Sequence, residues 1–352
     1  MTGYYRKPMV GGIVGALLLA SGSIASAQTV NILSANEASC DLYGVHIAKA
    51  LGIYEDAGVD ANMLSSETTV PYVAFLSNGD ADLTMLDSAQ VLQMANANQP
   101  GAVIYEVMQF APEGIFVLSD GPIETLEDLR GKTIGLASDR DQITVIIALD
   151  SVGISIGEVS TVVVGDSGPL MANSLTSGQV AAFAGAASDR AGIEAAGVAT
   201  HNITPTAVSQ NVGNSYAIWI PRMEKIRYPA SVFLRGLAMG NHAGVLDRNT
   251  TGAICRQAIP EQWEDLDVGW GLIDYSANVL NLKRTKRFGE PQPDVWAAVQ
   301  KPYIALGEID GFIEPATFLD FSFIDDANAW TTLELKHRLA AWREANPDAL
   351  MD

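Results

Sequence analysis

The sequence predicts an α/β protein built as two lobes, with a long helical segment towards its C-terminal end. Its 352 residues, 48% of them hydrophobic and 18% charged, have globular composition and are enough for about two domains. From residue 30 to residue 184, short β-rich runs alternate with helical stretches, which is typical of helices layered around mainly parallel sheets. After Pro229 the chain instead carries Trp and Leu at helical spacing, as in residues 331–342.

The first lobe is predicted from the residues that follow Gln28. We expect its strands at residues 30–33, in the second half of 53–63, at 82–86 and at 103–108. Helices are expected at residues 43–51, 71–77 and 89–96, the second of them closed by Gly79. This alternation describes one small α/β unit.

The second lobe repeats the same alternation over about a hundred residues. Its strands are predicted at residues 116–118, 133–136, 161–164 and 180–184, and its helices at 125–129, 142–152 and 170–177. One more strand is expected at 216–220. Because the helical segment after it has no strands with which to build a third sheet, we expect it to pack against the first lobe.

This placement makes the first lobe discontinuous and joins the lobes by two crossings, near residues 109–114 and 210–215. Two such crossings form a hinge. The resulting division is a leader at 1–27, a first lobe from 28–112 and 214–352, and a second lobe at 113–213.

Residues 1–27 have the pattern of a secretory signal peptide. Arg6 and Lys7 precede an apolar stretch from Met9 to Ala20, and Ala25 and Ala27 supply the small residues that signal peptidase recognises. The apolar stretch is shorter than a bilayer requires. We therefore expect cleavage after Ala27 and export.

Charge and side-chain chemistry exclude several classes of function. With 21 basic against 41 acidic residues, the net charge of −20 has the wrong sign for a nucleic-acid partner. The two cysteines, Cys40 and Cys255, lack metal-site spacing, and we expect buried free thiols rather than a disulfide. The four histidines are scattered, so neither a metal site nor a cofactor is expected.

Four segments in order resemble the periplasmic substrate-binding proteins of the SsuA/THI5-like (NMT1-like) family. They are Ala48-Lys49-Ala50-Leu51-Gly52 with the Ala57-Gly58-Val59-Asp60 that follows, Leu76 to Leu83 around Gly79, Asp128-Leu129-Arg130-Gly131-Lys132 with Ile134-Gly135, and Gly178-Gln179 with Ala182-Phe183. Each motif alone is weak, but four in this order behind a signal peptide indicate the family.

The resemblance implies a type II periplasmic binding-protein fold whose two lobes close on a small molecule. It further implies a non-enzymatic, monomeric, periplasmic protein that delivers its ligand to an ABC permease in the inner membrane. A binding protein that serves a sensor has the same fold. The alternative in another class is a secreted enzyme of the THI5-like superfamily.

The ligand is expected in the loops that follow the strands, at the carboxyl edges of the sheets. Helix capping is the alternative role for several of these polar residues. Family members often have Gly-Ser where this chain has Asp139-Arg140-Asp141, and Trp-Glu-Pro where it has Ala186-Ala187-Ser188. The candidate ligand-binding residues are Asn36, Tyr43, Asp87, Ser88, Phe110, Ser138, Arg140, Asp141, Gln142, Asp189 and Tyr216.

Carboxylates outnumber bases in these loops and crossings. Arg140 is the single base, against Glu37, Asp41, Asp87, Glu106, Glu113, Asp139, Asp141 and Asp189. Because a buried carboxylate is costly unless it is paired, this balance favours a nitrogen-containing or cationic ligand. The alternative is a sulfonate or carboxylate held by Arg140 and a helix N-terminus.

Overall fold

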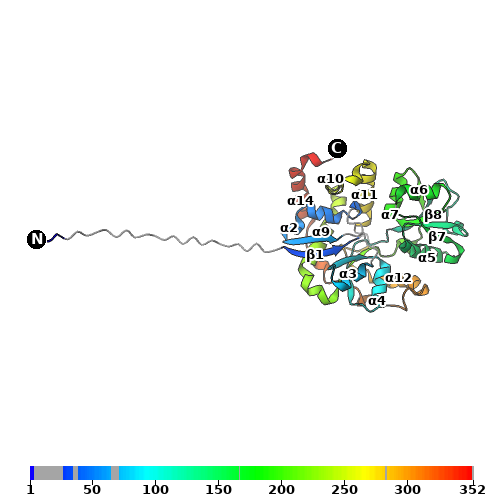
Figure 1. Ribbon diagram of the computed structural model, residues 1–352, viewed down its shortest axis with the longest axis horizontal. Coiled ribbons are helices and arrows are strands. Elements are labelled where there is room, and N and C mark those ends of the chain that lie inside the picture. The colour runs from blue at the N-terminus through cyan, green and yellow to red at the C-terminus, as the bar shows by residue number, and fades with distance from the viewer. Residues whose placement is uncertain (4–26, 35–38, 65–70, 166, 282–283, 351–352) are drawn as a thin grey trace.

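A computed structural model describes residues 1–3, 27–34, 39–64, 71–165, 167–281 and 284–350. Two five-stranded sheets organise these residues into two lobes (Figure 1). Most of the predicted leader lies outside these ranges. Asn36 also lies outside them. Within the described ranges, no helix has both the length and the apolar character needed to cross a bilayer.

The first-lobe sheet has the strand order β2-β1-β3-β10-β4. Its strands are β1 (Gln28–Leu33), β2 (Val59–Leu64), β3 (Leu83–Leu86), β4 (Gly101–Glu106) and β10 (Ser215–Trp219). β1 pairs in parallel with β2 and β3, whereas β10 is antiparallel to β3 and β4. The late strand β10 therefore returns the chain to the first lobe, as the predicted double crossing requires.

The second-lobe sheet repeats this arrangement with the order β7-β6-β8-β5-β9. Its strands are β5 (Glu113–Leu118), β6 (Thr133–Leu136), β7 (Ser160–Val163), β8 (Ala182–Ala186) and β9 (Thr200–Asn202). β6 is parallel to β7 and β8, and β5 is antiparallel to β8 and β9. The two matching sheets confirm the predicted fold class of two α/β lobes.

Helices cover both sheets, and the C-terminal helices cover mainly the first (Figure 1). The first-lobe helices are α1 (Gly44–Ala50), α2 (Ile53–Asp56), α3 (Tyr72–Asn78), α4 (Ser88–Asn96), α9 (Met223–Leu246), α10 (Arg248–Ala258), α11 (Leu266–Val279), α12 (Pro293–Ala305), α13 (Ile324–Ala327) and α14 (Thr332–Ala345). The second-lobe helices are α5 (Gln142–Asp150), α6 (Gly168–Thr176), α7 (Ala187–Ala195) and α8 (Thr206–Ser209).

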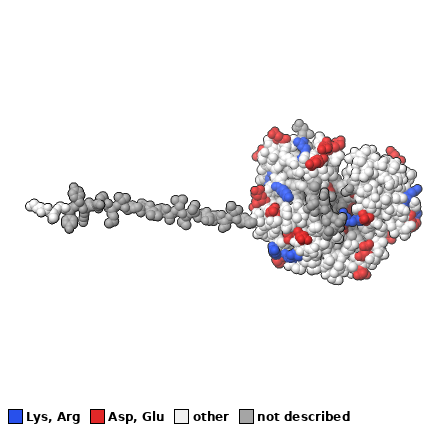
Figure 2. Space-filling view, viewed as in Figure 1, with Lys and Arg blue, Asp and Glu red and all other residues white. Residues whose placement is uncertain are grey.

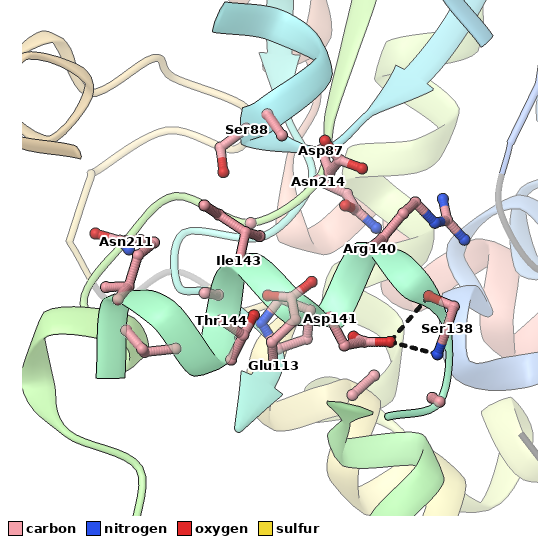
Figure 3. A pocket seen from close by; sticks show the side chains of 18 of the residues that line it. Asp87, Ser88, Glu113, Ser138, Arg140, Asp141, Ile143, Thr144, Asn211 and Asn214 are labelled. Atoms are coloured by element: carbon pink, nitrogen blue, oxygen red, sulfur yellow. Dashed lines mark hydrogen bonds between the residues drawn. The ribbon is translucent and has the colours of Figure 1, made fainter. Parts of the chain in front are cut away.

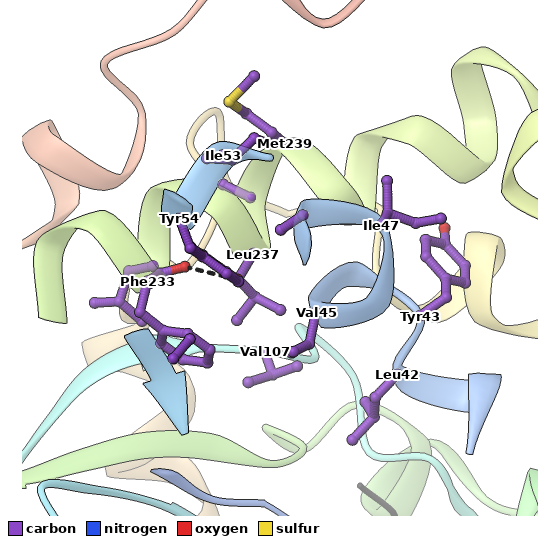
Figure 4. Close-up of a cluster of buried hydrophobic side chains, with 14 of the residues drawn as sticks. Leu42, Tyr43, Val45, Ile47, Ile53, Tyr54, Val107, Phe233, Leu237 and Met239 are labelled. Atoms are coloured by element: carbon purple, nitrogen blue, oxygen red, sulfur yellow. Dashed lines mark hydrogen bonds between the residues drawn. The ribbon is translucent and has the colours of Figure 1, made fainter. Parts of the chain in front are cut away.

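The main hydrophobic core of the first lobe lies between its sheet and helices α1 and α9. Tyr54, Phe233 and Leu237 are buried there, and the Tyr54 hydroxyl donates to the Phe233 carbonyl at 3.4 Å (Figure 4). Cys40 and Cys255 are free, buried thiols in this core, as expected. A second apolar cluster joins Val103 and Trp296 of the first lobe to Ile115 of the second, so the lobes also share a core.

Several elements were not predicted from the sequence, among them α2, α7, α8 and β9. Helix α7 begins in the loop predicted at 185–189 and was not predicted as a helix, because the run of small residues around Gly192 gives little helical periodicity and only Ile193 is fully buried. Strand β9 is three residues long, too short to register as a β-rich run. The helical segment also begins earlier than expected, since α9 starts at Met223 and contains Pro229.

Candidate binding pocket between the lobes

A cavity of about 640 Å³ lies between the two lobes and is lined by both. The first lobe contributes the turn after β3 and helices α11 and α12, and the second contributes the segment from Ser138 into α5. Residues of both crossings complete the wall, among them Glu113 and Asn214 (Figure 3). The volume is in the range of small-molecule sites, and the position matches the carboxyl edges of parallel strands.

The second-lobe wall begins with a capping arrangement directly after β6. The Ser138 amide and hydroxyl donate to Asp141 Oδ2 at 2.8 and 2.9 Å, the two bonds drawn in Figure 3. Residues 139–141 form a single 3-10 turn, from which α5 continues at Gln142. Burial raises the pKa of Asp141, and its bonds to Ser138 oppose that rise. Asp141 thus serves the helix start, while Arg140 stays exposed at the cavity.

The first-lobe wall is built in the same way after β3. Asp87 caps α4, because Oδ1 accepts from the Gln90 amide and Oδ2 from the Gln90 side chain, both at 2.8 Å. The Ser88 hydroxyl lies 3.1 Å from the Tyr303 hydroxyl of α12. The sequence left helix capping and ligand contact as alternative roles for Asp87. In the structure Asp87 caps α4 and also lines the cavity.

The structure places seven of the predicted residues on the cavity wall. They are Asp87, Ser88, Ser138, Arg140, Asp141, Gln142 and Asp189. Asp189 does not stand in a loop, however: it lies in the first turn of α7, where its carboxylate accepts from the Ala186 amide at 2.7 Å. Asn36 lies outside the described residues.

Three residues predicted to contact the ligand, Tyr43, Phe110 and Tyr216, do not line this cavity. Tyr43 is fully buried under α9, and its hydroxyl donates to the Asn241 carbonyl at 3.0 Å (Figure 4). Tyr216 is also fully buried, with its hydroxyl 2.9 Å from that of Ser34. Phe110 stacks instead against the Arg284 guanidinium, 3.9 Å from ring centroid to Cζ.

Two tyrosines of the pocket were missed, Tyr275 of α11 and Tyr303 of α12. Both belong to the helical segment that the sequence analysis assigned to the first lobe without giving it a role at the ligand. Helical spacing alone does not distinguish a tyrosine that faces a cavity from one that faces a core. No sequence signal marked them.

Glu113 begins β5 at the end of the first crossing and is half-buried in the pocket. Burial raises the pKa of its carboxyl to about 7; the nearby charges of Asp87 and Asp141 raise it further, and Arg140 lowers it. This carboxyl is therefore the pocket group whose charge changes near neutral pH.

The crossings are paired with each other and fastened by Arg284. The Ala111 amide donates to the Asn211 carbonyl at 2.8 Å, and the Val107 amide to the Asn214 carbonyl at 2.9 Å. The Arg284 guanidinium donates to the Gln109 carbonyl at 3.0 Å and to the Gln210 carbonyl at 2.7 Å. One side chain thus holds both connections between the lobes.

Replacing Arg284 with methionine, which keeps the aliphatic stem, is expected to speed amide hydrogen exchange in both crossings by about tenfold. The expectation follows from charge-assisted hydrogen bonds being worth about 1.5–3 kcal/mol each. Mass spectrometry of peptides covering 107–114 and 210–215 measures this. Arg222→Met serves as the control, since Arg222 binds α3 carbonyls instead. Unchanged exchange in either crossing would contradict the role of Arg284 in holding both crossings.

The balance of charge on the wall is acidic. Arg140 is the basic residue among the described lining residues, against seven carboxylates, which are Asp41, Asp87, Glu113, Asp139, Asp141, Asp189 and Glu308. Acidic side chains also dominate the face shown in Figure 2, over both lobes. No group of three or more potential metal ligands gathers among the residues that the structure describes.

Comparison with known proteins gives one family and a shared fold. The family model described as NMT1/THI5 like matches residues 39–219, just over half of the chain. A search of curated protein sequences finds no match. The periplasmic aliphatic sulphonate binding protein SsuA from Escherichia coli superposes with a TM-score of 0.63 at 15% identity, covering 82% of this chain and 96% of its own.

Two further solved structures share the fold. The alkanesulfonate-binding protein SsuA from Xanthomonas axonopodis pv. citri, bound to MOPS, has a TM-score of 0.63 at 13% identity, covering 84% of this chain and 99% of its own. The desulfurization enzyme DSZB has a TM-score of 0.56 at 12% identity, covering 85% and 98%. The periplasmic binding-protein fold is therefore shared by proteins that bind and by a protein that catalyses.

Proposed function

The chain belongs to the NMT1/THI5-like family, and from this premise we propose that it is the solute-binding protein of an ABC importer, capturing one small organic molecule between its lobes. The observation that carries the proposal is a cavity of about 640 Å³ with walls from both lobes and both crossings. A ligand that touches both lobes favours the closed arrangement, which gives a permease a state to recognise.

The lobes that close in this proposal are residues 28–112 with 214–352, and residues 113–213. The two crossings are hydrogen-bonded to each other, and Arg284 binds both. This arrangement supports a hinge motion of the lobes about the crossings. The apolar cluster around Trp296 contains residues of both lobes. Because a packed cluster resists being pulled apart, it supports a limited rotation of one lobe against the other rather than a wide separation.

The ligand that we propose is nitrogen-containing or cationic, because seven carboxylates face one arginine in the described wall. The second candidate is a sulfonate or carboxylate at Arg140, favoured by the sulfonate-binding proteins among the structural neighbours. The Asp139 and Asp141 carboxylates on either side of Arg140 weigh against that candidate.

We propose binding rather than catalysis. The described cavity lining holds neither a cysteine, as a nucleophile, nor a histidine, as a general base for its serines. The desulfurization enzyme among the neighbours keeps a secreted enzyme as the alternative. Conversion of a bound compound would distinguish the two.

The proposed setting is the periplasm, with the leader cleaved after Ala27, a monomeric mature chain and an inner-membrane ABC permease as partner. The leader pattern in residues 1–27 and the family support this setting. A sensor in place of the permease is the alternative partner, and disruption of neighbouring permease genes would separate them by abolishing uptake.

Thermal-shift screening of the purified mature chain tests the function. Amines, pyrimidines, sulfonates and aromatic carboxylates form the panel. A true ligand at a hundred times its Kd adds about 2.7 kcal/mol to the unfolding free energy, a rise of roughly 5 °C in Tm. Arg140→Ala serves as the comparison, because it weakens an acidic ligand and spares a cationic one. Turnover of a stabilising compound would contradict the proposal.

A further inference from the structure

Glu113 differs from three other acidic residues of the pocket, Asp87, Asp141 and Asp189, in that it does not cap a helix. Asp87, Asp141 and Asp189 each accept hydrogen bonds from backbone amides at the start of a helix. Within the described part of the chain, the Glu113 carboxyl accepts only from its own backbone amide. Capping therefore does not explain a half-buried carboxyl at the junction of the first crossing and β5.

The surroundings of Glu113 come from four separate elements. The charged groups that face it are Asp87 before α4, and Asp141 and Arg140 before α5. Tyr275 of α11 and Tyr303 of α12 are close enough to feel its charge, since Glu113 adds to the burial that raises the pKa of each hydroxyl. Asp87 and Asp141, from the two lobes, lie on the same cavity wall as Glu113 (Figure 3). Tyr275 and Tyr303 also line this cavity.

This combination suits an organic cation. An ammonium group neutralises the Glu113 carboxylate and shares the field of Asp87 and Asp141, and the tyrosine rings offer aromatic surface that tolerates positive charge. An anionic group placed at the same position would face three carboxylates. Ile143 and Ile147 also line the cavity, and their apolar side chains suit contact with an uncharged hydrocarbon part of the ligand.

We propose that Glu113, on the cavity wall between the two lobes, is the counter-ion of an ammonium group on the ligand. This inference rests on the proposed binding function and adds the charged group of the ligand, its partner residue and a proton that leaves on binding. Glu113 determines specificity for charge.

The direction of the pH dependence follows from the chemistry of the carboxyl. With a pKa of about 7, ligand-free Glu113 is about half protonated at neutral pH. The ammonium group binds the ionised form, so affinity rises with pH through 7 and binding releases about half a proton at pH 7. Between pH 7.5 and 5.5 the ionised fraction of Glu113 falls by about 25-fold, and we expect the affinity for the ammonium group to fall by the same factor.

The test uses probes that share a carbon skeleton and differ in charge, beginning with 2-phenylethylamine, 2-phenylethanol and 3-phenylpropanoate. Isothermal titration into the mature wild-type chain, in two buffers of different ionisation enthalpy, measures both affinity and proton release. We expect the amine to bind best and to release a proton. Glu113→Gln is expected to weaken the amine by at least tenfold and to abolish the proton release, with the alcohol unaffected.

Glu344→Gln is the matched control, because it removes the same charge from an exposed position of α14 outside the cavity. Its affinity for the amine is expected to equal that of the wild type. Equal or stronger binding of the alcohol, or an unchanged Glu113→Gln variant, would overturn the inference. Preferential binding of the carboxylate, lost in Arg140→Ala, would also overturn it while leaving the binding function intact.

Discussion

Replacing Glu106 with alanine is expected to lower the free energy of unfolding by about 3 kcal/mol. Glu106 is 1% exposed and accepts from the Gln292 amide at 2.8 Å, the Gln292 side chain at 2.7 Å and the Trp296 indole at 2.8 Å. Removing the carboxyl leaves these donors buried without an acceptor, at about 1–3 kcal/mol each before water compensates. Urea unfolding of wild type and variant measures the loss.

The same residue gives the protein a dependence on pH. Burial raises the pKa of Glu106 to about 7, against the hydrogen bonds from Gln292 and Trp296. Because the folded state holds this proton more tightly than the unfolded chain, the contribution of Glu106 to stability is greatest at acidic pH and falls as pH rises from about 4.5 to 7. Glu106→Gln should flatten part of this decline. An unfolding free energy that falls over this interval as steeply in the variant as in the wild type would contradict the assignment.

Glu106 also has a place in the function. It ends β4 directly before the first crossing, and Gln292, which it binds, is next to Pro293 at the start of α12. The helix that carries Tyr303 is thereby fastened to the strand that leads into the hinge. Glu106→Ala is expected to disturb the pocket as well as the core.

Replacing Gly240 with alanine is expected to lower the free energy of unfolding by about 3 kcal/mol. Helices α1 and α9 meet with backbone against backbone, and a Cβ at Gly240 would collide with the carbonyl of Gly44. Overpacking in a rigid core costs about 1–3 kcal/mol, and here neither colliding group is a flexible side chain. Thermal and urea unfolding of wild type and variant both measure this loss of stability.

Gly271 is the control for that substitution. It lies in α11, where an added Cβ meets nothing within 4 Å. Gly271→Ala should therefore raise stability by up to about 1 kcal/mol, since alanine favours the helix more than glycine does. Equal effects at the two glycines would show that helix propensity, rather than the contact between α1 and α9, governs position 240.

Patterning along the sequence predicted the two α/β lobes because buried strands leave β-rich runs and turns leave glycines. Gly79 ends α3 with a φ of 85°, and the strand expected at 133–136 is β6 with those bounds. The tail was predicted as helical because it carries Trp and Leu at helical spacing. The short strand β9 and the small-residue helix α7 carry too little pattern to be read from sequence.

The pocket was predicted less completely. Loops that follow β3 and β6 were identified correctly because strand ends are visible in the pattern, and Asp87 and Arg140 lie on the cavity wall. Tyr43 and Tyr216 were misplaced because an aromatic residue beside a strand end can turn towards a core, as both do. Tyr275 and Tyr303 depend on how the helical segment docks against the lobes, which local patterning does not encode.

Native mass spectrometry of the mature protein, purified without denaturation, tests the central claim most directly. We expect chains that carry one small organic molecule each, with a cationic or nitrogen-containing group, and release it unchanged when the complex is activated. We also expect Glu113→Gln to reduce the occupied fraction. A wild-type chain that carries only sulfonates or carboxylates would contradict the proposed ligand class, and a chain that returns an altered compound would contradict the binding function itself.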